Sequence, residues 1–347
     1  MPKLMVISDT HLGVKRQTGT TQETQAELSI NLLRDFRALL HIANRDGHDL
    51  LINGDLFDGF EVSKSVEFDV FKLLFKWVTE SGHRLILSAG NHDLNRCSDV
   101  KSSFQNLCSY LTSVSPDRVQ IIDGAWSLDR IHSVAIIPHL PNQEEFDAAM
   151  EEVLAKPDHF YVVCVHANYD NFFARESDHS LNVSAEMAKR FEDASIKMVF
   201  GHEHKKRQIG NVHIVGNQLI TSVADCLNDD TKQYILIDQG EIEYHTFTTV
   251  SDVYAEVDWR ETEMPNVDFV RVTGTAEYSE AADVVSKLAK WRKESPAFVI
   301  TNAVKVGQME IEIEQQDLKH ESFDIQSMVL GQLPEKLKSK FEELINA

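Results

Sequence analysis

The sequence predicts a layered α/β fold, and two patterns point to it. Over the first 250 residues, short apolar runs alternate with longer stretches whose apolar residues recur at helical spacing. This alternation is typical of a sheet covered by helices. Several later apolar runs follow one another through short turns, so part of the sheet is expected to be antiparallel. After about residue 250 the pattern changes, and a second, smaller α/β unit is expected there.

The individual elements follow from these patterns. Apolar runs of four to six residues predict strands at 3–7, 49–53, 84–88, 133–137, 160–165, 196–200, 212–215 and 233–237. Helical spacing predicts helices at 21–46, 64–81, 102–113, 143–155 and 184–192. In the smaller unit, a strand, a helix and a strand are predicted from "FVRVTGTA", "SEAADVVSKLAKWRKES" and "AFVITNAVKV".

The end of the chain differs from both units. From Glu321 onward it carries two amphipathic helical patterns, and Pro334 opens the second of them. We therefore expect three parts: a main domain over 1–250, a small α/β domain over 251–310 and a helical tail over 311–347.

Composition limits the class of protein. A chain of 347 residues that is 42% hydrophobic can bury a large core. It contains no 18-residue apolar run, and its N-terminus leads directly into a predicted strand, so neither a membrane span nor a signal peptide is expected. Its four cysteines form no CxxC pair, which favours reduced thiols in the cytoplasm. The net charge of −21, taken alone, argues against a general nucleic-acid binder.

Polar motifs follow five of the predicted strands. They are "DTHLG" from Asp9, "GDLFD" from Gly54, "GNHD" from Gly90, "HAN" from His166 and "GHEH" from Gly201. In α/β sheets, ligands bind outside the carboxyl ends of the strands. We therefore expect one edge of the sheet to gather eight candidate side chains: Asp9, His11, Asp55, Asn91, His92, His166, His202 and His204.

Imidazole and carboxylate groups without thiolate are ligands that suit divalent Mn, Fe or Zn. The donors are too many for one ion and sufficient for two, and two-metal sites clamp an in-line displacement at phosphorus. Asp55, with two oxygens, is the expected bridge. Gly54, Gly90 and Gly201 are expected to let the backbone turn tightly beside the ions. Asp9 and His11 alone would also fit an ordinary turn, but five such motifs in order favour a metal site.

The order of these motifs resembles that of the calcineurin-like metallophosphoesterases, whose fold is a layered β-sandwich flanked by helices. Within that superfamily, "DTHLG" and "GDLFD" resemble the SbcD-type DNA-repair nucleases, bacterial and viral relatives of the eukaryotic meiotic-recombination nuclease. The smaller unit is similar to that family's capping domain. The resemblance implies a cytoplasmic protein, or one in the host cytoplasm if the chain is viral.

The resemblance also implies a role for each motif residue. One metal ion would be held by Asp9, His11, Asp55 and His204, and the other by Asp55, Asn91, His166 and His202. His92 would be catalytic, in contact with the scissile phosphate or the leaving oxygen. The family's usual metal is Mn²⁺, with Mg²⁺, Fe²⁺ and Zn²⁺ as alternatives. Some relatives carry histidine where this chain has Asp58, so the proton-transfer role of that histidine is not carried over.

Short basic clusters sit beside three of the five motifs, although the chain is acidic. On the expected fold they could contact phosphates next to the one being cut, or they could simply be polar loop residues. They comprise Lys15, Arg16, Arg96, Lys205, Lys206 and Arg207. Nothing in them predicts base recognition.

Two partners are expected besides DNA. The sequence has no GxxxxGK[ST] loop, so any ATPase must be another chain, and the resemblance implies an SbcC-type, SMC-like ATPase. The tail helices would dock on it, unless they fold back on this chain. Helix 64–81 is apolar on more than one face. It is either buried within the monomer or, as the family's helical contact implies, a homodimer interface.

The function that these predictions favour is a two-metal DNA nuclease subunit of an ATP-dependent recombination and repair complex. It would have exonuclease and endonuclease activity, hydrolysing phosphodiester bonds by metal-activated water. The first alternative is a phosphatase or cyclic-nucleotide phosphodiesterase, which would need neither the second domain nor the tail. The second is a scaffold that docks the ATPase on DNA, which would be expected to have lost ligands.

Overall fold

The computed structural model describes residues 2–15, 22–94, 100–171, 180–228, 231–249, 254–295 and 297–307. The chain up to Val306 forms one compact unit. The predicted tail helices lie outside the described residues, and so does the domain boundary predicted after residue 250, so both stay predictions. Among the described residues, no helix is both long and apolar enough to cross a membrane.

Two six-stranded sheets form the centre of the described structure. The first runs in the order β14 (Glu241–Phe247), β13 (Lys232–Asp238), β1 (Leu4–Ile7), β2 (Asp49–Asn53), β3 (Leu85–Ser88) and β4 (Val119–Ile122). The second runs in the order β11 (Arg207–Ile209), β12 (Val212–Ile214), β10 (Lys197–Gly201), β7 (Val162–His166), β6 (Val134–Ile137) and β5 (Ser127–Asp129). The strands β1 to β4 pair in parallel, and so do β12, β10, β7 and β6. The strands β13, β14, β11 and β5 pair antiparallel with their neighbours. The sequence predicted that part of the sheet would be antiparallel.

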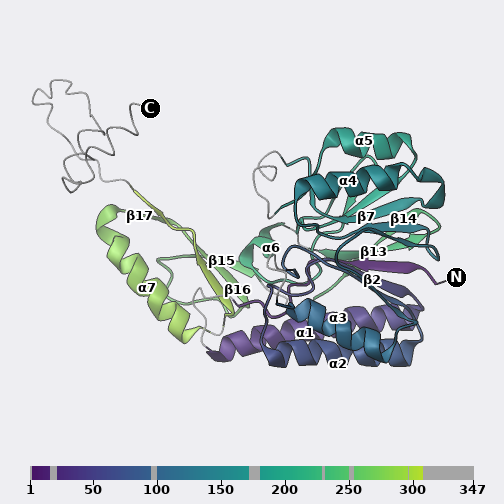
Figure 1. Ribbon diagram of the computed structural model, residues 1–347. Helices are drawn as coiled ribbons and strands as arrows, with labels where there is room; N and C mark the ends of the chain where they lie inside the picture. The colour runs from purple at the N-terminus through teal and green to yellow at the C-terminus, as the bar shows by residue number, and fades with distance from the viewer. Residues whose placement is uncertain are drawn as a thin grey trace, which may run out of the picture. The chain divides into compact units, whose positions relative to one another are not determined.

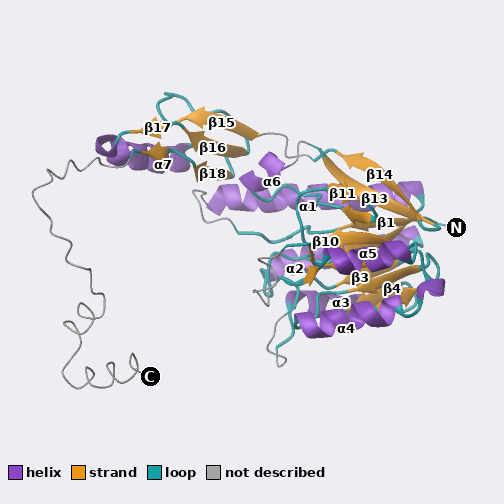
Figure 2. Cartoon of the chain, turned by 90° about the horizontal axis from the view of Figure 1, so that it is seen from above, coloured by secondary structure: helices purple, strands orange, loops and turns teal. Residues whose placement is uncertain are grey.

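Helices cover the outer face of each sheet (Figure 1; Figure 2). The first sheet is covered by α1 (Gln22–Asp46), α2 (Lys64–Ser81) and α3 (Ser103–Val114). The second is covered by α4 (Gln143–Leu154) and α5 (Ala185–Asp193). The result is a four-layer arrangement of helices, sheet, sheet and helices, which confirms the predicted fold class.

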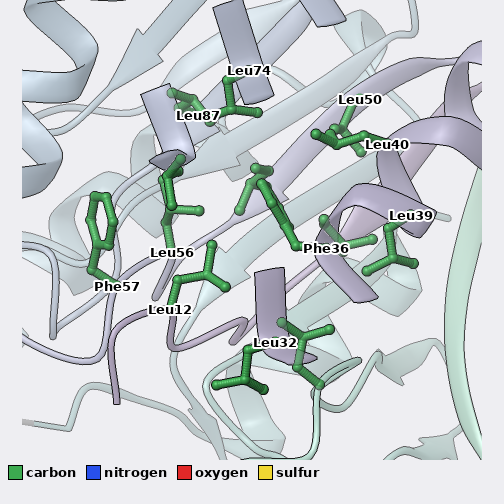
Figure 3. Close-up of a cluster of buried hydrophobic side chains, with 14 of the residues drawn as sticks. Leu12, Leu32, Phe36, Leu39, Leu40, Leu50, Leu56, Phe57, Leu74 and Leu87 are labelled. Carbon is green, nitrogen blue, oxygen red and sulfur yellow. The ribbon is translucent and has the colours of Figure 1, made fainter. Parts of the chain in front are cut away.

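Strand residues alternate between two buried environments. In β1, Leu4 and Val6 face the space between the sheets, whereas Met5 and Ile7 pack under the helices. Figure 3 shows the helix-side cluster, where Phe36 of α1 lies among leucines such as Leu50 of β2. Because both faces are buried, the strand sequences are continuous apolar runs, which is why they were predictable.

The eight predicted strands and five predicted helices of the main domain are present, with ends within two residues of those expected. The four edge strands of the two six-stranded sheets, β14, β4, β11 and β5, were not predicted. Their burial explains the difference, because β11 is exposed throughout and β14 buries only part of its residues. An edge strand with a solvent-facing side gives no continuous apolar run.

The smaller unit contains a parallel sheet of β15 (Tyr254–Asp258), β16 (Phe269–Thr273) and β18 (Val299–Asn302). The helix α7 (Ala281–Glu294) packs Val284, Leu288 and Trp291 into a separate buried cluster with β16 and β18. Two short strands, β17 (Thr275–Ala276) and β19 (Lys305–Val306), pair beside it. The predicted strand, helix and strand are therefore present, and β15 was missed.

A buried ion cluster links the two sheets at the amino-terminal ends of their parallel strands. His132 lies between two carboxylates, bonded to Asp129 and 3.3 Å from Asp49 Oδ2. The Arg84 guanidinium lies 2.8 Å from the Asp129 carboxylate. Asp49 belongs to the first sheet and Asp129 to the second, so the histidine connects them electrostatically.

This cluster predicts a pH dependence of stability. Burial lowers the pKa of His132, but Asp129 and Asp49 outweigh it and raise the pKa to about 9, from 6.5. The stabilisation is therefore complete below pH 6.5 and is lost as the pH rises through about 9. We expect the free energy of unfolding to fall by about 2–3 kcal/mol across this window. Urea unfolding of the wild type and His132→Gln measures it, and equal pH slopes in both proteins would contradict the assignment.

Candidate metal centre

The five polar motifs lie where β1, β2, β3, β7 and β10 end. Backbone hydrogen bonds hold the first two motifs side by side. The Asp9 N–H donates to the Gly54 carbonyl at 3.1 Å, and the His11 N–H donates to the Asp55 carbonyl at 3.0 Å. The parallel pairing of β7 with β10 places His166 opposite Gly201. The predicted convergence on one edge is therefore present in the structure.

Backbone strain concentrates at this edge. Asp9, His11, Asp55 and His202 all have left-handed backbone conformations, with φ of 53°, 43°, 51° and 87°. Non-glycine residues seldom adopt this region, and they persist there only where surrounding structure holds them. Four of the predicted ligands are thus held in unfavourable conformations that point their side chains into one site.

The three glycines predicted beside the ions are needed for two different reasons. Gly54 has φ of 90°, and a Cβ at that position would lie 2.0 Å from His166 Nδ1. Gly90 and Gly201 do not adopt the left-handed conformation, but Gly90 does begin a tight turn, in which the Asp93 N–H donates to the Gly90 carbonyl at 3.3 Å. A Cβ at Gly90 would lie 2.1 Å from Asp55 Oδ1, and one at Gly201 would lie 2.2 Å from Ser8 Oγ. These two glycines make room for neighbouring polar groups.

One group of donors combines Asp9, His11 and His204, whose nearest donor atoms all lie within 4.8 Å of one another. The Nε2 atoms of His11 and His204 are only 3.1 Å apart. The two imidazoles direct nitrogen atoms at the same small region. A divalent cation is a natural partner for such converging nitrogen and oxygen donors.

A second group combines Asp55, His166 and His202, again within 4.8 Å. Asn91 adds its amide oxygen, which lies 3.1 Å from His166 Nε2 and 2.9 Å from His202 Nδ1. All four residues come from different strand ends. This group contains the predicted ligands of the second ion.

Asp55 lies between the two groups. Its Oδ2 atom is 3.3 Å from His166 Nε2 in one group and 3.7 Å from His11 Nε2 in the other. The donors fit two divalent cations chemically, because they supply carboxylate, imidazole and amide oxygen ligands and no thiolate. Asp55 would be the ligand that both ions share.

The pKa shifts of these groups indicate a site that attracts positive charge. Burial lowers the pKa of His166, but Asp55 and Asp9 outweigh it and raise the pKa to about 9. Burial also lowers the pKa of His11, but Asp58 and Asp55 outweigh it and raise the pKa to about 9. Burial opposes ionisation of Asp55, yet the neighbouring histidines hold its pKa well below the usual range. Metal ligands must lose such protons, so binding would release protons.

Comparison with known proteins identifies the family. A profile of the calcineurin-like phosphoesterases matches residues 2–206. The chain belongs to this family. It is therefore a metallophosphoesterase-type, metal-dependent hydrolase, and the two donor groups are its candidate metal sites. A search among curated proteins finds no match.

Three solved structures are similar to this calcineurin-like phosphoesterase. TT1561 of Thermus thermophilus is 12% identical, with a TM-score of 0.39 over 71% of this chain and 98% of its own. A dimetal phosphatase from Danio rerio is 9% identical, with a TM-score of 0.39 over 71% and 99% of the two chains. A 5′-nucleotidase precursor, also from Thermus thermophilus, is 13% identical, with a TM-score of 0.35 over 71% and 53%. At these scores the similarities carry no argument about the substrate.

In this phosphoesterase, two hydrogen bonds hold His92, one made by its backbone N–H and one by its ring. Its N–H donates to Asp55 Oδ1 at 2.9 Å, and its Nδ1 lies 2.7 Å from the Asp58 carbonyl oxygen. A carbonyl oxygen only accepts, so Nδ1 carries a proton and Nε2 remains for another partner. His92, His11 and Asp55 also have donor atoms within 4.8 Å, so His92 lies close enough to act on a phosphoester bound there.

Several supporting residues of the phosphoesterase site were not predicted. Asp225 accepts a hydrogen bond from His204 Nδ1 at 2.8 Å, and the Asn53 carbonyl accepts one from His166 Nδ1 at 2.9 Å. Asp93 accepts bonds from the backbone of the Asp55 loop; burial and the charge of Asp55 raise its pKa to about 7. Asp93 stands within "GNHD", whereas Asp225 belongs to no motif.

The structure describes four of the six residues that were predicted to contact phosphates near the phosphoesterase site. Lys15 and Lys205 are exposed, and Arg16 and Arg96 lie outside the described residues. Lys206 donates to Thr231 Oγ1 at 2.6 Å, and Arg207 pairs with Glu203 at 2.6 Å. These two cations have partners within the chain, so a DNA contact by either would require an exchange of partners.

Proposed function

We propose that this phosphoesterase is the nuclease subunit of an SbcD-type recombination and repair complex, hydrolysing DNA phosphodiester bonds as an exonuclease and endonuclease. The observation that carries the proposal is the second α/β unit, with its own sheet and buried cluster, directly after the metal-site domain. A phosphatase would need no such unit. The order of the motifs "DTHLG" and "GDLFD" supports the same assignment.

The proposed chemistry assigns each donor group a task. Two divalent ions, Mn²⁺ by preference, would activate water and neutralise charge developing at phosphorus. Asp9, His11, Asp55 and His204 would hold one ion, and Asp55, Asn91, His166 and His202 the other. His92, with its Nδ1 anchored by Asp58, would present Nε2 to the scissile phosphate or the leaving oxygen. A scaffold without activity is disfavoured, since no ligand is missing.

The rival function is that of a phosphatase or cyclic-nucleotide phosphodiesterase on the same site. It is favoured by the internal pairing of Lys206 and Arg207, which leaves less positive charge for a DNA backbone. A small phosphoester needs few contacts beyond the metal centre, so this site would serve it as well.

One assay separates the two functions. Purified protein with Mn²⁺ is given end-labelled duplex and single-stranded DNA, p-nitrophenyl phosphate and a cyclic nucleotide in parallel. The nuclease proposal expects cleavage of DNA to exceed hydrolysis of both small substrates by orders of magnitude. Asp55→Asn, purified in the same way, controls for contaminating nucleases. Hydrolysis of small substrates without DNA cleavage would replace the proposal by its rival.

The proposal includes an SbcC-type, SMC-like ATPase partner. The tail from residue 311, its expected docking element, lies outside the described residues. A chain ending near Lys319 is expected to retain Mn²⁺-dependent cleavage of short DNA and to lose binding to the ATPase. Unchanged binding of the ATPase would exclude the tail as the docking element.

We also expect a homodimer through α2. This helix buries Val70, Leu74 and Trp77 against its own sheet, which accounts for one of its apolar faces. Its other face exposes Phe68, 58% accessible, in a stack with Phe71 and Phe75. Tyr110 of α3, 54% accessible, packs against Phe71 and extends this aromatic patch. A two-fold contact would cover the patch with its own copy.

Light scattering at micromolar concentration tests the dimer. The wild type is expected to be a dimer, and Phe68→Ser with Phe75→Ser a folded monomer, because the patch loses its aromatic surface. Tyr161→Ser is the matched control, since Tyr161 is 57% accessible on a different part of the surface. A monomeric wild type would contradict the prediction.

A further inference from the structure

The buried carboxylate of Asp225 belongs to α6 (Val223–Asn228) and is only 1% accessible. Its Oδ1 lies 2.8 Å from His204 Nδ1. Its Oδ2 accepts hydrogen bonds from the Thr221 N–H at 2.9 Å and the Thr221 hydroxyl at 2.8 Å. Both oxygens therefore have partners, and the carboxylate is held in one orientation.

The Asp225 contact determines which nitrogen of His204 is available. A carboxylate accepts, so Nδ1 carries the proton and Nε2 is left with its lone pair. That lone pair faces another donor of the same group, because His204 Nε2 lies 3.1 Å from His11 Nε2. In metal sites, a carboxylate behind a ligating histidine fixes the ring and raises its basicity.

The other side of α6 contacts the smaller unit. Both β16 and β18 touch this helix. Val223 lies in the same buried cluster as Phe269, Phe298 and Val299, and Cys226 packs against that cluster. The helix that carries Asp225 therefore lies between His204 and the β15–β16–β18 sheet of the smaller unit.

We propose that Asp225 is a positioning residue for His204 and that α6 makes this position depend on the packing of the smaller unit. The inference rests on the metal centre of the proposed function and not on DNA as the substrate. Docking of the smaller unit against Val223 would hold α6, and α6 would hold the imidazole toward the ion shared with His11. Loosening that contact would weaken one metal site and leave the other unchanged.

The first test measures metal binding without substrate. Isothermal titration with Mn²⁺ is expected to show two sites in the wild type and, in Asp225→Ala, a loss of about 10- to 100-fold at one of them. Asp225→Asn keeps an oxygen that can accept from Nδ1, so a smaller loss is expected. Wild-type affinity at both sites in Asp225→Ala would overturn the positioning role.

A matched control separates positioning from general destabilisation. Asp129 is an equally buried carboxylate bonded to a histidine, His132, at the opposite ends of the strands. Asp129→Asn is expected to lower thermal stability and to leave both Mn²⁺ affinities unchanged. Equal affinity losses in Asp129→Asn and Asp225→Asn would also overturn the proposal, because they would reflect stability alone.

The second test addresses the smaller unit. Phe298→Leu reduces packing in the cluster that contains Val223, whereas Val272→Ala reduces packing only within the unit's own core. We expect a several-fold loss of Mn²⁺ affinity at the His204 site in the first variant and none in the second. Wild-type affinity in Phe298→Leu would overturn the dependence on the smaller unit. Neither test includes a substrate, so a failure of this proposal can be distinguished from a failure of the nuclease assignment.

Discussion

Asp55→Asn is expected to abolish hydrolysis and to remove at least one bound metal ion, with little change in the fold. Asp55 Oδ2 lies near histidines of both donor groups, at 3.3 and 3.7 Å, so a neutral amide there weakens both sites at once. Losing the metal ions removes several kcal/mol of transition-state stabilisation. Each 1.36 kcal/mol is tenfold in rate, so turnover should fall by about three orders of magnitude or more.

Asparagine is the informative replacement at this position. It tolerates the left-handed backbone that Asp55 adopts, at φ of 51°, and its oxygen can still accept the His92 N–H. Metal content, initial rate and circular dichroism would be measured together. Asp238→Asn, a carboxylate at the far end of the β1–β13 pair, serves as the control. Two bound ions with full activity would exclude Asp55 as the bridge.

His92→Gln is expected to keep both metal ions and to lose most turnover. The Asp58 carbonyl holds the proton on Nδ1, so Nε2 is the atom left to act on the phosphoester. Glutamine fits the space but cannot transfer a proton, and general acid–base catalysis typically contributes about 10²–10⁴-fold. Single-turnover rates and Mn²⁺ titration separate the two roles. Loss of a metal ion in this variant would make His92 a ligand, which its distance from His11 and Asp55 permits.

The sequence predicted the inner strands of the two sheets well and the edge strands poorly, for one physical reason. Strands such as β2 and β7 are buried on both faces and read as continuous apolar runs. The edge strands β11 and β14 have exposed faces and mix polar with apolar residues. Sequence periodicity reports burial, so elements that bury little leave a weak signal.

The candidate site likewise contains residues that the sequence could predict and residues that it could not. Its converging donors were predictable because each follows a buried strand whose end places it on the shared edge. Asp225 was not, since it approaches His204 only through tertiary packing of a short helix with no recognisable motif. The sequence predicted tight turns at Gly90 and Gly201, whereas the close approach of these glycines to Asp55 and Ser8 is visible only in three dimensions.

The left-handed conformations of Asp9, His11, Asp55 and His202 have a consequence for laboratory evolution. Each such residue costs about 1–2 kcal/mol relative to an ordinary backbone conformation, against a total stability of about 5–15 kcal/mol for a typical domain. Glycine at these positions would relieve the strain and remove the donor in one step. A library screened for heat resistance alone, with chelator present, would therefore be free to accumulate changes at this edge. A screen with Mn²⁺ present would oppose them, because bound ions stabilise only the strained form.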